Sequence, residues 1–67
     1  MFQITVNGDV MSVDDGQTIA DLITRLGLEN KRLAVELNRD IVSRSDFTKT
    51  ILSNGDTVEI VQAIGGG

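Results

Sequence analysis

The residues best suited to chemistry in this sequence are the three glycines at its end, Gly65, Gly66 and Gly67. Glycine has no side chain to pack and the widest backbone freedom of any residue, so these positions add almost nothing to a core. They predict a thin, flexible tip that ends in the α-carboxylate of Gly67 and can enter a narrow channel or lie against a nucleotide phosphate. Four extended residues would project roughly 13 Å from the last packed position. Taken alone, such an end is more often a frayed terminus or a linker, so its meaning depends on the residues before it.

The residue types that are missing narrow the chemistry further. The 67-residue sequence has no Cys, His, Trp or Tyr. It therefore cannot build a Cys/His zinc site, a thiol nucleophile or a His-dependent triad, and it cannot form a disulfide, which fits a reducing compartment. No apolar run approaches the length of a membrane span, and the start lacks the pattern of a signal peptide. We expect a cytoplasmic protein that does not associate with membranes.

The net charge and the aromatic content indicate which class of partner the protein can bind. The formal net charge is −4, and all six basic residues lie between positions 25 and 49. An acidic protein with only two aromatic residues, Phe2 and Phe47, is a poor candidate for binding nucleic acid. The charge distribution instead favours a protein partner that has a basic surface.

The first part of the sequence predicts a hairpin. Residues 2–6 alternate apolar and polar side chains, which is typical of a half-buried strand. Asn7-Gly8 then predicts a two-residue turn, because both positions tolerate positive φ. Residues 10–13 form the return strand. The side chains expected to face inward are Phe2, Ile4 and Val6 on the first strand and Met11 and Val13 on the second, whereas Val10 faces outward.

A short helix is predicted after the loop at residues 14–17. Thr18 is a suitable N-cap, and Asp21, three residues later, can complete a capping box. Apolar side chains then recur at the spacing of one helical face, so we expect a helix from about residue 19 to residue 26. The residues of this stripe are Ile19, Leu22, Ile23 and Leu26. Gly27 lies where a left-handed residue commonly ends a helix.

The second half predicts a third strand at residues 32–37, a turn at 38–40, a short edge strand at 41–42 and a last strand at 57–62. Its inward side chains are expected to be Leu33, Val35, Leu37, Val58 and Ile60. Phe47 should anchor an otherwise polar loop, and Leu52 should be buried.

Together these elements predict an α+β roll, in which a single helix crosses and covers one face of a mixed sheet of four to five strands. Residues 1–63 would form one domain, and residues 64–67 a flexible glycine tail. If the first and last strands pair in parallel, the tail leaves from a well-anchored strand at the centre of the sheet.

This ordered set of motifs resembles the ubiquitin-like β-grasp family and, more narrowly, the ThiS-like sulfur carriers of bacterial thiamine (thiazole) biosynthesis. The resemblance covers essentially the whole sequence. It rests on residues 6–8 at the hairpin turn, 18–23 at the helix, 34–38 and 41–42 around the third strand, and Leu52, 54–56, 58–61 and 64–67 at the end. The third terminal glycine departs from the family's minimum of two, but the sequence still ends in a glycine carboxylate.

The resemblance implies a protein that is acted on and performs no catalysis. An adenylating (E1-like) enzyme, using ATP and Mg²⁺, would activate the Gly67 carboxylate. A sulfur donor such as a cysteine desulfurase would help convert it to a thiocarboxylate, and thiazole synthase would receive the sulfur. Gly65 and Gly66 would provide reach and clearance. The carrier itself would hold no metal or other cofactor and would be a monomer when free.

The outward side of the last strand predicts where a partner grips the body. The expected contacts are Glu59, Val61, Ala63 and Ile64, with Val61 as the main apolar one. Three other functions stay open, because one fold hosts many. The chain could be the small subunit of molybdopterin synthase, which is usually somewhat longer, a protein modifier joined to lysines through its last glycine, or a binding module with an inert tail.

Overall fold

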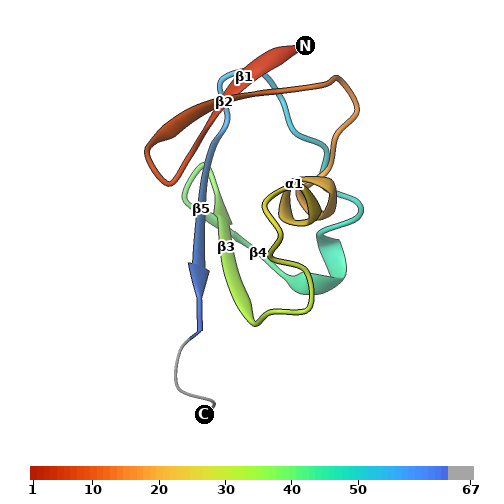
Figure 1. The fold of residues 1–67 in the computed structure, drawn as a ribbon, viewed down its shortest axis with the longest axis vertical. Helices are drawn as coiled ribbons and strands as arrows, with labels where there is room; N and C mark the ends of the chain where they lie inside the picture. The colour runs from red at the N-terminus through yellow and green to blue at the C-terminus, as the bar shows by residue number, and fades with distance from the viewer. Residues whose placement is uncertain (64–67) are drawn as a thin grey trace.

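A five-stranded mixed sheet and one α-helix make up the fold of the computed structural model, which describes residues 1–63 (Figure 1). The elements are β1 (Phe2–Val6), β2 (Asp9–Val13), α1 (Ile19–Arg25), β3 (Leu33–Leu37), β4 (Asp40–Val42), a 3-10 helix η1 (Arg44–Asp46) and β5 (Thr57–Gln62). The strand order is β2-β1-β5-β3-β4. In Figure 1, α1 is seen nearly end-on while β5 runs along the long axis, so the helix crosses the sheet. The predicted α+β roll is confirmed, with five strands.

The first two strands form the predicted hairpin. Asn7 (φ 49°) and Gly8 (φ 86°) both have the left-handed backbone that the mirror-image turn of a two-residue hairpin requires. Val13 is buried, and Met11 is half-buried against the core. Val10 is 65% exposed, so the predicted inward and outward sides of β2 are confirmed.

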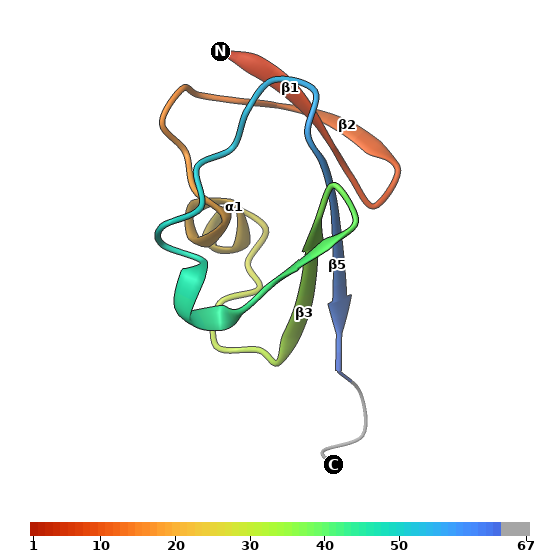
Figure 2. The same cartoon turned by 180° about the vertical axis from the view of Figure 1, so that it is seen from behind.

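The last strand, β5, lies at the centre of the sheet. It runs parallel to β1, with Val6 beside Val58, and antiparallel to β3, with Val35 beside Ile60. The predicted parallel pairing of the first and last strands is therefore confirmed. Seen from either side, β5 ends far from the N-terminus along the long axis (Figure 2). A segment that continues from β5 thus starts from a strand with neighbours on both sides.

The start of α1 is fixed by the predicted capping box. The backbone N–H of Asp21 donates to Thr18 Oγ1 at 3.2 Å, and the backbone N–H of Thr18 donates to Asp21 Oδ2 at 3.0 Å. These two bonds satisfy donors that the first helical turn leaves without an intrahelical acceptor. The buried side chains of the helix, Ile19, Leu22 and Ile23, belong to the predicted stripe and pack in the core.

The end of α1 differs from the prediction at one residue. The helix ends at Arg25, and Leu26, expected in the buried stripe, is 38% exposed. The reason is a left-handed turn at Gly27 (φ 72°), where the N–H groups of Gly27 and Leu28 bond back to the carbonyls of Thr24 and Ile23, each at 3.0 Å. This turn directs Leu28, rather than Leu26, against the core.

The segment between β4 and β5 packs on the same side of the sheet as α1. Phe47 and Leu52 are buried in the core, as predicted. The carbonyl of Phe47 accepts a hydrogen bond from the N–H of Ala20 at 3.0 Å, and the N–H of Leu52 donates to the carbonyl of Gln17 at 2.8 Å. The loop and helix therefore cover one face of the sheet together and leave the opposite face to solvent.

Candidate functional site

The face of the sheet turned away from α1 is exposed along β5. The burial of β5 alternates, with Val58 and Ile60 in the core and Glu59 and Val61 outside. The exposed fraction of Val61 is 62%, and Ala63 beyond the strand is exposed as well. The predicted exposure of these three residues is confirmed, whereas their contact with a partner stays a prediction.

The neighbouring strands add three exposed residues to this face. In the antiparallel pairing of β3 with β5, Ala34 lies beside Val61 and Glu36 beside Glu59. On the other side of β3, Ile41 of β4 lies beside Glu36 and is 82% exposed. We call this set the outer patch: Ala34, Glu36, Ile41, Glu59 and Val61. It combines apolar side chains with two carboxylates that face each other across a strand pair.

Two asparagine side chains hold β5 in place, and the first belongs to the β1–β2 turn. Asn7 Oδ1 accepts a hydrogen bond from the N–H of Ile60 at 2.8 Å, while Asn7 Nδ2 donates to the carbonyl of Ile60 at 3.1 Å. The backbone N–H of Asn7 also donates to the carbonyl of Val58 at 2.9 Å. The hairpin turn is thus bonded to the half of β5 that leads to Val61.

The second asparagine, Asn38, belongs to the β3–β4 turn and holds the start of β5. Its Oδ1 accepts from the N–H of Thr57 at 2.9 Å, and its own N–H donates to the carbonyl of Thr57 at 2.8 Å. Its Nδ2 donates to Asp56 Oδ1 at 3.0 Å, while Asp56 Oδ2 accepts from the N–H of Ser53 at 2.7 Å. Both hairpin turns are therefore bonded to β5, the β3–β4 turn at its start and the β1–β2 turn at Val58 and Ile60 in its middle.

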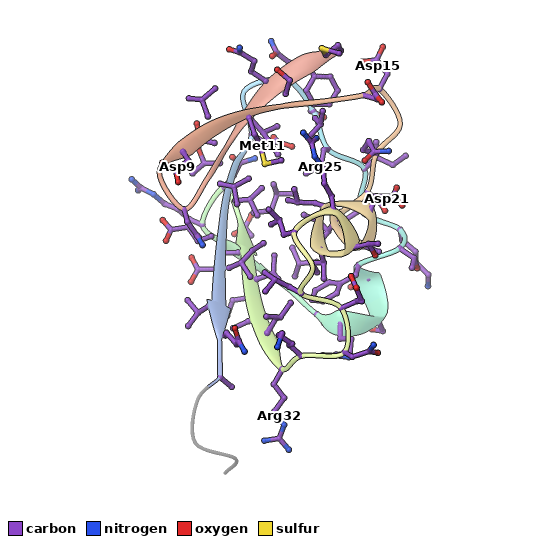
Figure 3. The ribbon with its side chains drawn as sticks, in the orientation of Figure 1. Asp9, Met11, Asp15, Asp21, Arg25 and Arg32 are labelled. Atoms are coloured by element: carbon purple, nitrogen blue, oxygen red, sulfur yellow. The ribbon has the colours of Figure 1, made fainter. Side chains whose placement is uncertain are left out.

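Basic side chains gather where the described part of β5 ends. The N–H of Ala63 donates to the carbonyl of Arg32 at 2.9 Å, and Arg44 Nη2 donates to the carbonyl of Lys31 at 2.7 Å. Arg32 extends beyond the start of β3 in Figure 3. A shallow cavity of about 410 Å³ lies at this end. It is lined by Arg32, Leu33, Ala34, Arg44, Val61 and Ala63. The predicted contact Ile64 and the predicted reacting tail, Gly65, Gly66 and Gly67, lie outside the described residues.

Two kinds of feature are absent from residues 1–63. Within residues 1–63, no group of three acidic side chains is arranged to hold a metal ion. No helix in that range is long and apolar enough to cross a membrane. The most organised features of the described residues are β5, clamped by hydrogen bonds from both hairpin turns, and the outer patch.

Sequence reasoning missed the residues that lie across the strands from the predicted contacts. Ala34, Glu36 and Ile41 join Glu59 and Val61 only because of the β3–β5 and β3–β4 registers. The alternation of inward and outward side chains along residues 32–37 and 41–42 indicates which residues face outward. It does not indicate which strand lies beside each segment. Asn7 and Asn38 were predicted only as turn residues. Their side-chain hydrogen bonds to β5 were missed.

Solved structures of known proteins share this fold. The crystal structure of a thiamine biosynthesis protein, ThiS, from Geobacter metallireducens superposes with a TM-score of 0.82 at 32% identity, covering 98% of this chain and all (100%) of that one. The solution structure of the thiamine biosynthesis protein from the same organism gives a TM-score of 0.79. The match confirms the predicted β-grasp architecture.

Curated relatives fall into two groups by length. The sulfur carrier protein ThiS of Bacillus subtilis is 38% identical over 65 residues, which cover 96% of this chain and 98% of that protein. A thiazole synthase of Paramagnetospirillum magneticum is 34% identical over 65 residues, covering 97% of this chain. The chain spans about a fifth of the length of such thiazole synthases, 20% in each of two.

A match to the model of a whole protein family points to the same identity as the shorter relatives. The sequence model of the ThiS family matches residues 4–67 and so includes the second half of β1, the helix, the other four strands and the glycine end. From this nearly complete match, together with the relatives of almost equal length, it follows that the chain belongs to the ThiS family.

Proposed function

We propose that this chain is a sulfur carrier of thiamine (thiazole) biosynthesis, and that the carboxylate of Gly67 is the group converted to a thiocarboxylate. The observation that carries the proposal is the match to the sulfur carrier protein ThiS of Bacillus subtilis, which extends over 96% of this chain and 98% of that protein. The clamped β5 gives it physical support, because the tail would extend from a strand bonded to both hairpin turns.

The first step would be activation of the carboxylate by an adenylating (E1-like) enzyme. The carboxylate is ionised at neutral pH. One of its oxygens attacks the α-phosphorus of ATP, an O–P bond forms, and pyrophosphate leaves with its bonding electrons. The enzyme would supply Mg²⁺ and cationic groups for the phosphates, since residues 64–67 carry no charged side chain.

The second step would replace AMP by sulfur. Hydrosulfide attacks the carbonyl carbon of the acyl-adenylate, a C–S bond forms, and AMP leaves with the electrons of the broken C–O bond. The product is a thiocarboxylate. A persulfide loaded by a cysteine desulfurase would serve as donor if a thiol then cleaved the resulting acyl disulfide. The sulfur would pass to thiazole synthase.

In this proposal the chain is a cosubstrate and performs no catalysis of its own. Gly65 and Gly66 would let the end enter two different enzyme active sites, because neither has a Cβ to meet the channel wall. Contacts from Glu59, Val61, Ala63 and Ile64 would orient the body. The cytoplasmic location and the monomeric free state stay predictions.

The test is intact mass spectrometry after incubation with ATP, Mg²⁺, sulfide and the adenylating enzyme of the thiamine pathway. We expect one oxygen of the chain to be replaced by sulfur, and tandem fragmentation to locate the change at Gly67. A variant that lacks Gly66 and Gly67 is the matched control and should gain no sulfur.

Two results would contradict the proposal. An unchanged mass with an enzyme that is active on a known carrier would exclude sulfur loading. Attachment of the chain to lysines of other proteins, without a thiocarboxylate, would favour a protein modifier. To distinguish thiazole from molybdopterin synthesis, the loaded chain is given to thiazole synthase, and thiazole formation is expected.

A further inference from the structure

We infer that the outer patch is a docking surface for thiazole synthase, and that a Lys or Arg side chain of that enzyme lies between Glu36 and Glu59. This inference rests on the proposed function and adds the chemistry of the contact. Apolar side chains of the enzyme would pack on Ala34, Ile41 and Val61.

The first observation is the pair of carboxylates. Glu36 and Glu59 are directly opposed in the antiparallel pairing of β3 with β5. Opposed residues of such a pair have Cβ atoms about 5 Å apart, and like charges at that distance destabilise the sheet. Within residues 1–63, neither carboxylate takes part in a hydrogen bond or an ion pair. The pairing therefore brings two like charges together, and a cation placed beside both would relieve their repulsion.

The second observation is the space around these carboxylates. A hollow of about 360 Å³ is lined by Glu36, Asn38, Arg39, Thr57 and Glu59. The backbone of Arg39 is left-handed (φ 74°), and its side chain forms no hydrogen bond or ion pair with a described residue. The hollow thus has room for an incoming cationic side chain.

The third observation is the exposed apolar surface beside the hollow. Ile41 is 82% exposed next to Glu36, and Val61 is 62% exposed next to Ala34. Within residues 1–63, no element packs on this face, because α1 and the segment between β4 and β5 both lie on the other side of the sheet (Figures 1 and 2). A partner with apolar side chains around a basic one is complementary to this arrangement.

The position of the outer patch connects docking with the tail. Glu59 and Val61 belong to β5, the strand that continues towards the glycines. A partner bound to this face would therefore receive the tail from a fixed starting point. Both enzymes of the proposed function would receive the tail in this way, and we commit to thiazole synthase because two thiazole synthases contain a region similar to this chain over 97% of its length.

The first half of the test measures stability. Glu59→Gln removes the repulsion, so we expect its melting temperature to rise by about 2–5 °C. Glu29→Gln is the matched control, since Glu29 is exposed in the loop before β3 and forms no bond with a described residue. It changes the net charge equally and should leave the melting temperature unchanged. High salt should reduce the difference between the two variants.

The second half measures binding of the full chain to thiazole synthase by titration calorimetry. We expect the double variant Glu36→Gln/Glu59→Gln to bind about 5–10-fold more weakly than the wild type, although it is more stable. Val61→Ser should also weaken binding. Val10→Ser is its matched control, because Val10 is 65% exposed on β2, at the far edge of the same sheet.

The outcomes separate this inference from the proposed function. If the wild type binds but the double Gln variant binds with the same Kd as Glu29→Gln, the docking surface is wrong and the sulfur carrier stands. Equal Kd values of Val61→Ser and Val10→Ser for thiazole synthase would exclude the proposed apolar contact at Val61. A wild-type chain that accepts sulfur yet does not bind the synthase excludes this partner, whereas one that does neither excludes both proposals.

Discussion

The side chain of Asn7 occupies the position of a strand residue opposite Ile60. It accepts from the N–H of Ile60 at 2.8 Å and donates to the carbonyl of the same residue at 3.1 Å. β1 itself ends at Val6, where it pairs with Val58. The amide group of Asn7 therefore continues the pairing of β5 after the strand beside it has turned away.

Replacing Asn7 by Ala should destabilise the fold and loosen the end of β5. Both bonds to Ile60 are lost, and we expect the free energy of unfolding to fall by about 1–3 kcal/mol in urea denaturation. The Ile60 amide should exchange its hydrogen faster.

Asn30→Ala is the control for the left-handed backbone. Asn30 has a similar φ of 70°, and its side chain forms no hydrogen bond with a described residue. If Asn7→Ala and Asn30→Ala destabilise the protein equally, the cause is the backbone conformation, and the proposed role of the Asn7 amide is wrong.

Replacing Asp56 by Ala should also lower stability. The Asp56 side chain is buried and accepts hydrogen bonds from the N–H of Ser53 and from Asn38 Nδ2. Its removal leaves both donors without their acceptor, at a cost of about 1–3 kcal/mol. Each kcal/mol corresponds to roughly 4–8 °C in melting temperature for a domain of this size. Asp56→Asn keeps one acceptor oxygen and should give an intermediate value, and a wild-type melting temperature for Asp56→Ala would contradict this account.

Loss of the N-cap should weaken α1. Thr18→Ala removes the acceptor for the N–H of Asp21, and we expect about 1 kcal/mol less stability in urea denaturation. Thr24→Ala is the control, because the Thr24 side chain is exposed on the same helix and forms no such bond. Similar losses for both variants would show that the change reflects helix propensity and not the capping box.

A side chain in the tail should stop sulfur loading without unfolding the protein. We expect Gly66→Val to lower the rate of thiocarboxylate formation on the order of 100-fold, since displacement of a reacting group by about 1 Å has effects of that size. Intact mass measured over time gives the rate, and a proton–nitrogen correlation spectrum checks the fold. Wild-type loading by a folded Gly66→Val chain would mean that clearance in the enzyme channel is not the role of this glycine.

Local patterns predicted the elements of this fold well. The alternation in residues 2–6 and 57–62 is that of strands with one covered face, and Asn7-Gly8 forms the expected turn. Helix periodicity failed only at Leu26, because it continues through a residue that lies after the last helical turn. The bonds of Gly27 and Leu28, rather than apolar spacing, determine where the buried stripe ends.

The candidate site was predictable along β5 but not across the sheet. Parity alone places Glu59 and Val61 outside, whereas their neighbours depend on which strands pair and in which register. The same holds for Asn7 and Ile60, which are 53 positions apart in sequence. A turn signal describes the backbone of Asn7 and contains no information about a distant strand that its side chain reaches.

The strand order has a consequence for how the protein is made. The hairpins β1–β2 and β3–β4 pair with each other nowhere in the sheet, and β5 alone joins them. Since β5 is the last of the five strands to leave the ribosome, the two hairpins have no common sheet during most of translation. A nascent polypeptide that is still incomplete therefore has no finished body for an enzyme to grip, and synthesis itself delays recognition until the strand that leads to the glycines has emerged.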